Sequence, residues 1–136
     1  MKIFATIAAA TALAFAAPAT AAEPGKGVAS LYHVATGHQV MFLHWLANQD
    51  RASVAAGVGA SQLFVHTDGD SWDYLVIYPS MTPAQEDAAD AALKKMGVPS
   101  GMANSIELRK HIASHTDTLV RGPMTAADYL AILGEK

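Results

Sequence analysis

Histidines and their acidic neighbours are the residues of this chain best suited to proton chemistry, because the sequence has six histidines and no cysteine. His115 shares the spacing of a helical stripe with the apolar residues Leu108, Ile112 and Leu119. A histidine on such a stripe is either a hydrogen-bonded core residue or a group that transfers protons. Asp117 follows closely and is a candidate to orient it. We therefore take His115 as the leading candidate for a catalytic acid or base.

His66 is the second candidate catalytic residue, and it lies in the stretch 61–80, SQLFVHTDGDSWDYLVIYPS, whose pattern predicts a β-hairpin. Two runs of β-branched and aromatic residues flank a turn at residues 67–71. A turn with an odd number of residues places His66 opposite Trp72 and Phe64 opposite Tyr74. One face of the hairpin then carries the aliphatic residues Leu63, Val65, Leu75 and Ile77. The other face carries Gln62, Phe64, His66, Trp72, Tyr74, Val76 and Tyr78.

This aromatic face needs a cover, because the open face of an antiparallel sheet usually carries polar residues. A partner protein or a ligand would supply that cover. The alternative for His66 is a structural role, as a hydrogen-bonded histidine beside the turn. His33 lies in the middle of an earlier strand, and we place it on the cavity side because a dry core tolerates a titratable group poorly. The predicted ligand-binding residues are His33, Phe64, Trp72, Tyr74 and Tyr78.

The sequence does not predict a metal site. His111 and His115 are four residues apart, a spacing that suits two imidazoles on one metal ion, but no third ligand lies at a recognisable spacing. His111 also has a simple structural role, pairing with Glu107 one helical turn earlier. No nucleophile elbow, phosphate-binding loop or dinucleotide fingerprint is present in the sequence.

Residues 1–22 have the pattern of a secretory signal peptide. Lys2 precedes an uncharged apolar run at 3–17, which is short for a membrane span, and Pro18 precedes small residues at 19–22. The mature chain, 23–136, is then a single periplasmic or secreted domain that does not associate with the membrane. The net charge of the full chain is −3 and no basic stripe occurs, so we expect no nucleic-acid partner.

The order of the predicted elements indicates an α+β fold. A strand at 27–36 is followed by a helix at 38–56, the hairpin, a helix between Thr82 and Gly97, a helix at 102–115, a short strand at 116–121 and a final helix between Thr125 and Gly134. Apart from the final helix, this is a ferredoxin-like βαββαβ plan. It predicts a four-stranded antiparallel sheet with helices on one face and an extra C-terminal helix.

The chain resembles the dimeric α/β-barrel superfamily in the strand LYHVATG that runs into a helix, in the hairpin SQLFVH-TDGDS-WDYLVIYP, and in the order of its elements. The resemblance is architectural and covers roughly residues 28–121. It implies that the bare sheet faces of two subunits close against each other, here through Phe64, Trp72, Tyr74 and Tyr78. Members of this superfamily include cofactor-independent monooxygenases, isomerases and cyclases, and other branches bind haem through a histidine.

We therefore expect an exported homodimer that binds a small molecule between the sheet and its cover, with or without cofactor-independent chemistry. Two alternatives remain open from the sequence. The protein is a haem-binding protein, or it is a structural module without catalytic activity whose bare face serves only to form the dimer.

Overall fold

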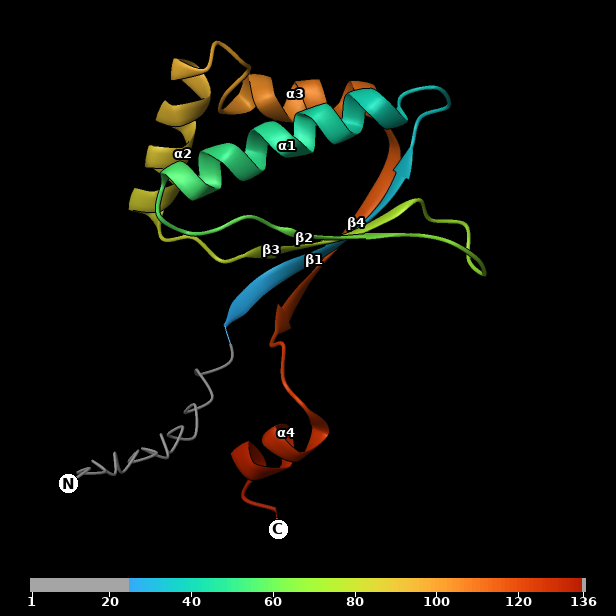
Figure 1. Ribbon diagram of the computed structural model, residues 1–136, viewed down its shortest axis with the longest axis vertical. Helices are drawn as coiled ribbons and strands as arrows, with labels where there is room; N and C mark the ends of the chain where they lie inside the picture. Colours follow the sequence, from blue (N-terminus) through green and yellow to red (C-terminus); the bar gives the residue numbers. More distant parts are fainter. Residues whose placement is uncertain (1–24, 136) are drawn as a thin grey trace, which may run out of the picture.

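The protein consists of one antiparallel sheet with a helical layer on one of its faces (Figure 1). The computed structural model describes residues 25–135, so the predicted signal peptide lies outside the described residues. In chain order, the elements are β1 (Lys26–Val34), α1 (Gln39–Ala55), β2 (Gln62–Val65), β3 (Tyr74–Pro79), α2 (Pro83–Lys95), α3 (Met102–His111), β4 (Ile112–Arg121) and α4 (Ala126–Leu133). The strand order is β2-β3-β1-β4, and all three pairings are antiparallel.

The predicted α+β class and the predicted order of elements are confirmed, and local signals explain where two of the helices begin. Helix α2 starts with a capping box: Thr82 accepts a hydrogen bond from the Gln85 amide, and the Gln85 side chain accepts one from the Thr82 amide at 2.9 Å. Helix α4 has the same device in Thr125 and Asp128. The fourth strand is also confirmed, and it is longer than predicted.

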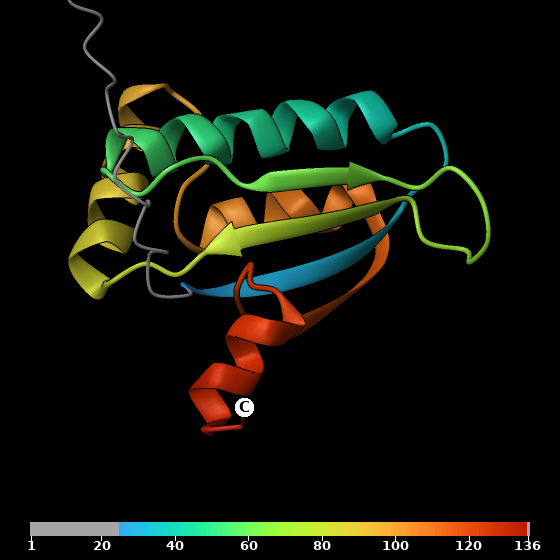
Figure 2. The same cartoon turned by 60° about the horizontal axis from the view of Figure 1, so that its bottom comes forward.

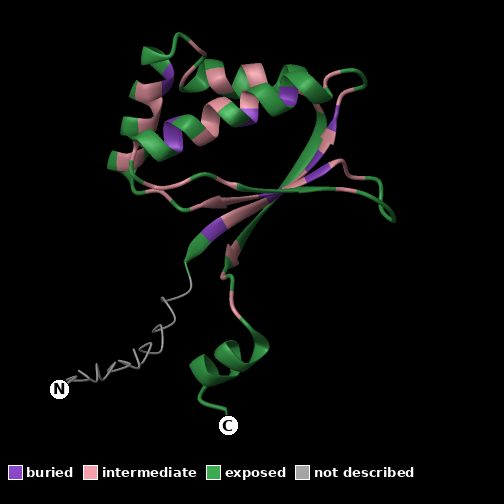
Figure 3. Cartoon of the chain, in the orientation of Figure 1, coloured by how far each residue is buried: buried purple, intermediate pink, exposed green. Residues whose placement is uncertain are grey.

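The core lies between the sheet and the helical layer (Figure 3). Alternation along β1 and β3 directs Tyr32 and Tyr74 toward α1, where both rings pack on the fully buried Phe42. The ring centroid of Phe42 lies 4.9 Å from that of Tyr32 and 5.3 Å from that of Tyr74. Val34, Leu46 and Val76 complete the buried cluster.

The predicted register of the hairpin is wrong by one residue. Phe64 pairs with Leu75, and Val65 pairs with Tyr74, so the connection at 66–73 has an even number of residues. Asp73 explains where β3 starts: its amide donates to the Tyr32 carbonyl at 2.8 Å, and its carboxylate accepts from the Val34 amide at 2.6 Å. A shift of one residue exchanges the faces of one strand relative to the other. The aromatic residues of the two strands therefore do not share a face.

The predicted helix at 102–115 is also too long, because α3 ends at His111. From Ile112 onward the chain pairs with β1, from Val34↔Ile112 to Lys26↔Arg121. This ladder replaces the helical hydrogen bonds, and the amide of Ala35 also bonds to the His111 carbonyl at 2.9 Å. The helical stripe that contained His115 therefore does not exist.

The face of the sheet opposite the helices is open, and we call it the bare face. Strand alternation and the register place on it Gly27, Ala29, Leu31, His33, Gln62, Phe64, Leu75, Ile77, Ser114, Thr116, Thr118 and Val120. Helix α4 projects on this side, away from α1, α2 and α3 (Figures 1 and 2), and every one of its residues is exposed. Within residues 25–135, no helix has both the length and the apolar character that a membrane crossing requires.

Candidate functional site

The structure distributes the predicted site residues over three places. His66 and Trp72 lie together in the loop between β2 and β3, with their ring centroids 4.8 Å apart. The Nε2 atom of His66 is buried and has no hydrogen-bond partner among the described residues. This pairing agrees with the expected neighbourhood of the two residues, although they sit at the loop end of the hairpin.

Phe64 and His33 lie on the bare face. Phe64 is 49% exposed, and His33 is half-buried beside Ser114 of β4. The expected orientation of His33, away from the helices, is therefore confirmed. Tyr74 and Tyr78 lie on the opposite, helix-covered face, so the expectation that all the aromatic residues line one bare surface is wrong.

The most connected group of polar side chains crosses the helix-covered face from β3 to β4. The hydroxyl oxygens of Tyr78 and Tyr32 are 2.9 Å apart, and the Tyr32 hydroxyl also interacts with the Ser30 hydroxyl. Ser30 donates to a carboxylate oxygen of Asp117 at 2.6 Å. The other carboxylate oxygen of Asp117 lies 3.3 Å from Nε2 of His115. We call these five residues the polar chain.

His115 is thus oriented by Asp117, as the sequence suggested, but from a strand rather than a helix. Its imidazole stacks on Tyr32 with ring centroids 5.7 Å apart and an interplanar angle of 17°. The His115 side chain is 37% exposed, whereas Tyr32 and Ser30 are almost fully buried. The polar chain therefore runs from the surface at β4 into the interior.

Burial keeps the two tyrosines protonated. Desolvation raises the pKa of Tyr78. The repulsion between the ionised forms of the two tyrosines and the hydrogen bond between Tyr78 and Tyr32 raise the pKa of Tyr78 further. Desolvation also raises the pKa of Tyr32, although hydrogen bonds with Tyr78 and Ser30 oppose it. Ser30 donates its proton to Asp117 and is left to accept from Tyr32, so the hydroxyls donate in sequence toward the carboxylate. The Tyr78 oxygen, at the far end, is then left to accept a hydrogen bond.

Tyr78 forms part of the wall of a pocket between the helical layer and the sheet. The pocket has a volume of about 320 Å³, and its lining includes Trp45, Gln49, Asp50, Ser61, Asn104 and Leu93. The Ser61 hydroxyl oxygen is buried and has no hydrogen-bond partner among the described residues. We call this space the helix–sheet pocket.

A network of amides holds one wall of the helix–sheet pocket in place. The Asn104 side-chain oxygen accepts from the Trp45 indole at 2.8 Å and from the Gln49 amide at 3.0 Å. Asn104 in turn donates to the Gln49 oxygen at 2.8 Å. These reciprocal bonds join α1 to α3, so the indole and both amides are preorganised.

The electrostatic character of the helix–sheet pocket is acidic. Asp50, Glu86 and Asp90 line it, and its lining contains no lysine, arginine or histidine. Asp50 accepts from the Ser61 amide at 2.8 Å, and Asp90 accepts from the Gly101 amide at 2.9 Å. The carboxylates of Asp50 and Asp90 are therefore held in position, and the pocket favours ligands that donate hydrogen bonds.

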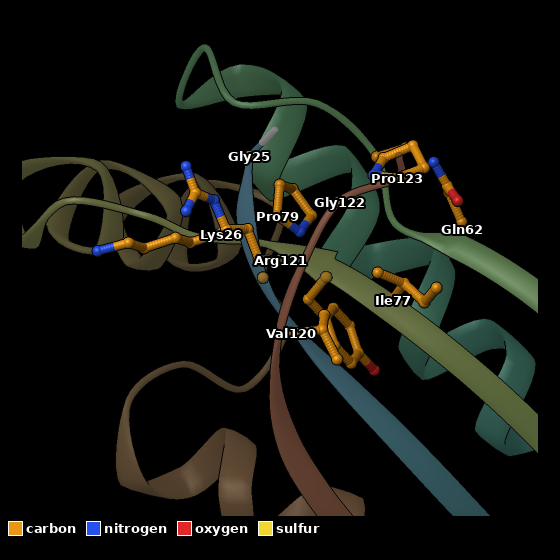
Figure 4. A pocket seen from close by; sticks show the side chains of 12 residues that line it. Gly25, Lys26, Gln62, Ile77, Pro79, Val120, Arg121, Gly122 and Pro123 are labelled. Atoms are coloured by element: carbon orange, nitrogen blue, oxygen red, sulfur yellow. The ribbon is translucent and has the colours of Figure 1, made fainter. Parts of the chain in front are cut away.

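A second hollow, of about 300 Å³, lies at one end of the bare face (Figure 4). Ile77, Val120, Pro79 and Pro123 give it an apolar lining. In Figure 4 the side chains of Lys26 and Arg121 extend away from Ile77 and Gln62. Gly27 also lines it, and a Cβ atom there would lie only 2.5 Å from the Tyr78 carbonyl oxygen.

The remaining histidines give no candidate metal centre. The Nδ1 atoms of His38 and His111 are 3.2 Å apart, and Glu107 lies 3.3 Å from Nε2 of His111. No group of three or more histidine, cysteine or acidic residues within the described chain is arranged to hold a metal ion. The predicted pairing of His111 with Glu107 is confirmed.

Sequence reasoning did not identify Ser30 and Tyr32 as site residues. Their signal was the alternation Ser30, Tyr32, Val34, which places two hydroxyl groups on one side of a strand. Comparison with models of known protein families finds no match, and no curated protein matches the sequence.

Proposed function

We propose that the protein binds a small molecule in the helix–sheet pocket, with the polar chain contacting a polar group of the ligand. One observation carries this proposal: a continuous row of hydroxyl, carboxylate and imidazole groups leads from the surface to the wall of a pocket. Buried polar groups cost free energy unless they are paired, and a packed core does not need them. A ligand that bonds to the end of this row would explain why polar groups are buried there.

The ligand class follows from the lining. Three carboxylates and the acceptor oxygen of Tyr78 suit a ligand with N–H donors, and the faces of Trp45 and Tyr78 suit a planar or cationic body. A small amine meets both conditions.

The same groups support proton transfer without a cofactor, the chemistry expected from the architectural resemblance. A proton accepted at Tyr78 passes along the polar chain as each hydroxyl gives its own proton to the next oxygen. The proton reaches Asp117 and the exposed His115, which exchanges it with solvent. His115 is then the terminal acid or base of the site, and Tyr78 is the group that touches the ligand.

We also propose that the chain has the dimeric α/β-barrel architecture. The order β2-β3-β1-β4, with β3 between β1 and β2 and β1 between β3 and β4, supports it, because two interleaved split βαβ units would give such an order. The aliphatic residues along the two central strands of the bare face support a homodimer. We also propose that residues 1–22 direct export to the periplasm or exterior, which the intact mass of protein recovered from those fractions tests.

A ligand screen with paired variants tests the binding proposal. Small amines, neutral amides and carboxylates are each added to the purified protein, and the melting temperature is followed, because a ligand stabilises the folded state by mass action. We expect amines to raise the melting temperature. Tyr78→Phe should abolish that rise, since it removes the acceptor oxygen.

Tyr74→Phe is the matched control, because Tyr74 lies on the same face of β3 and outside the polar chain. It should keep the response to amines. A ligand whose effect survives Tyr78→Phe but is lost in Phe64→Ala would place the site on the bare face instead.

Haem binding is the second candidate function, and the position of His33 on the bare face favours it. An added haem should then give a visible absorption band that His33→Ala abolishes. If haem leaves the spectrum of the protein unchanged, this candidate is wrong.

A further inference from the structure

Helix α4 and the two central strands of the bare face present apolar side chains that are exposed or only half-buried within the described chain. Tyr129, Leu130, Ile132 and Leu133 are 44–59% exposed on a helix of eight residues. A helix this short is marginal in water even with good caps, because its stability comes mainly from packing. α4 nevertheless has a complete capping box and ends at Gly134 in the left-handed conformation. Such a helix needs an apolar surface to pack against.

The bare face offers that surface. Leu31, Leu75, Ile77 and Val120 lie on it, and the hollow of about 300 Å³ in Figure 4 opens at the end nearest the β4–α4 connection. Figures 1 and 2 show α4 projecting on this same side of the sheet. A second copy stacked on the bare face therefore meets α4 directly.

The area of the bare face argues that α4 takes part in the interface. Four strands spaced about 4.8 Å apart, paired over about six residues of about 3.3 Å, present roughly 400 Å² in outline. A stable interface buries roughly 800 Å² on each partner. The sheet alone supplies only part of this area, and α4, about 12 Å long, adds a second apolar surface.

We propose that α4 of one copy packs over the bare face of a second copy and inserts apolar side chains into the hollow at Ile77 and Val120. The exchange is reciprocal, because in a twofold dimer the contact of one copy is repeated by the other. This inference rests on the homodimer of the proposed function, and it identifies α4 as the element that covers the bare face of the partner copy. Each subunit then contributes a sheet and a helical arm.

The first test measures the dimer dissociation constant by analytical ultracentrifugation of the purified protein. The double variant Leu130→Asp, Leu133→Asp should raise this constant at least tenfold or leave only monomers. Val40→Asp is the matched control, because Val40 is 65% exposed in the helical layer, and it should leave the constant unchanged. Leu75→Glu, on the bare face, should also break the dimer.

The outcomes separate the two proposals. If Leu75→Glu breaks the dimer but the α4 double variant does not, α4 is not part of the interface, and the homodimer through the bare face stands. If the unmodified protein is a monomer at micromolar concentration, both the homodimer and the exchange are wrong.

The second test shows which copy α4 covers. Because the sequence has no cysteine, only the introduced residues can form a disulfide. One chain carries Leu130→Cys and another carries Ile77→Cys. Mixing and mild oxidation should give a crosslinked species that contains one of each chain, identified by its mass. If no mixed species forms and a single chain carrying both changes crosslinks within itself, α4 folds onto its own sheet and the exchange is wrong.

Discussion

The two faces of the sheet differ in where they depart from the usual division of an antiparallel sheet: polar groups enter the covered face beside the core, and aliphatic residues lie on the bare one. The helix-covered face carries the hydroxyls of Ser30, Tyr32 and Tyr78, together with His115 and Asp117 toward its edge. The bare face is mainly aliphatic along its two central strands. Sheets of this kind usually put apolar residues under the helices and polar ones in water.

This difference suits the two faces to different tasks. Polar groups enclosed under helices lose their contact with water and must be paired, and here they form a connected row that ends at the candidate ligand site. Apolar groups left in the open need a cover, so the bare face is the proposed interface.

The largest expected difference is between two phenylalanines. Phe42→Ala removes a fully buried ring from between Tyr32 and Tyr74 and should lower the free energy of unfolding by about 3–5 kcal/mol. Phe64→Ala, on the bare face, should cost less than about 1 kcal/mol in the monomer but weaken the dimer. Urea unfolding at several protein concentrations separates these effects. Equal losses at every concentration would contradict the division between the faces.

The next effect is an alkaline loss of stability that originates on the helix-covered face. The pKa values of Tyr32 and Tyr78 are raised in the folded state, so near pH 10 and above the unfolded chain loses these protons first. Their contribution is complete below the unfolded pKa of about 10 and falls as pH rises above it, by up to about 1.4 kcal/mol per pH unit for each tyrosine. The double variant Tyr32→Phe, Tyr78→Phe should show a shallower decline between pH 9 and 11.

Tyr129→Phe is the control for this titration, because Tyr129 is 50% exposed on α4. It should leave the pH dependence of urea unfolding as in the unmodified protein. If the double variant declines as steeply as the control, the buried tyrosines do not govern stability at high pH.

The smallest effect compares two helices with the same cap. Thr82→Ala removes the cap of α2, which packs against α1, and should lower the global free energy of unfolding by about 1 kcal/mol. Thr125→Ala removes the cap of the exposed α4 and should leave the unfolding of the monomer unchanged, while amide hydrogen exchange in α4 accelerates. A global loss of similar size from Thr125→Ala would show that α4 is packed onto its own domain.

Much of the fold was predictable because its signals are local. The caps at Thr82 and Thr125, the stop at Gly97 and the β-branched runs identified most of the elements in the right order. The orientation of His33 was also anticipated, from the cost of burying a titratable group. These features depend on residues a few positions apart, so a single sequence contains them.

The candidate site was less predictable because it depends on register. The true hairpin connection has an even number of residues, and this moved Tyr74 and Tyr78 to the face opposite Phe64. His115 was assigned to a helix, since its spacing from Leu108 and Ile112 fits a helical period. Pairing with β1 makes this segment a strand instead, and no pattern among neighbouring residues predicts that pairing.

The sequence by itself determined the order of the helices and strands and where α2 and α4 begin, because capping, turn formation and β-propensity act over a few neighbouring residues. It also determined which groups are present for proton chemistry, above all the histidines and tyrosines. Only the tertiary structure decided that Tyr78, Tyr32, Ser30, Asp117 and His115 form one connected row. The physical reason is that strand pairing brings residues 30, 78 and 117 together, and a slip of one position would have directed their side chains to the opposite face of the sheet.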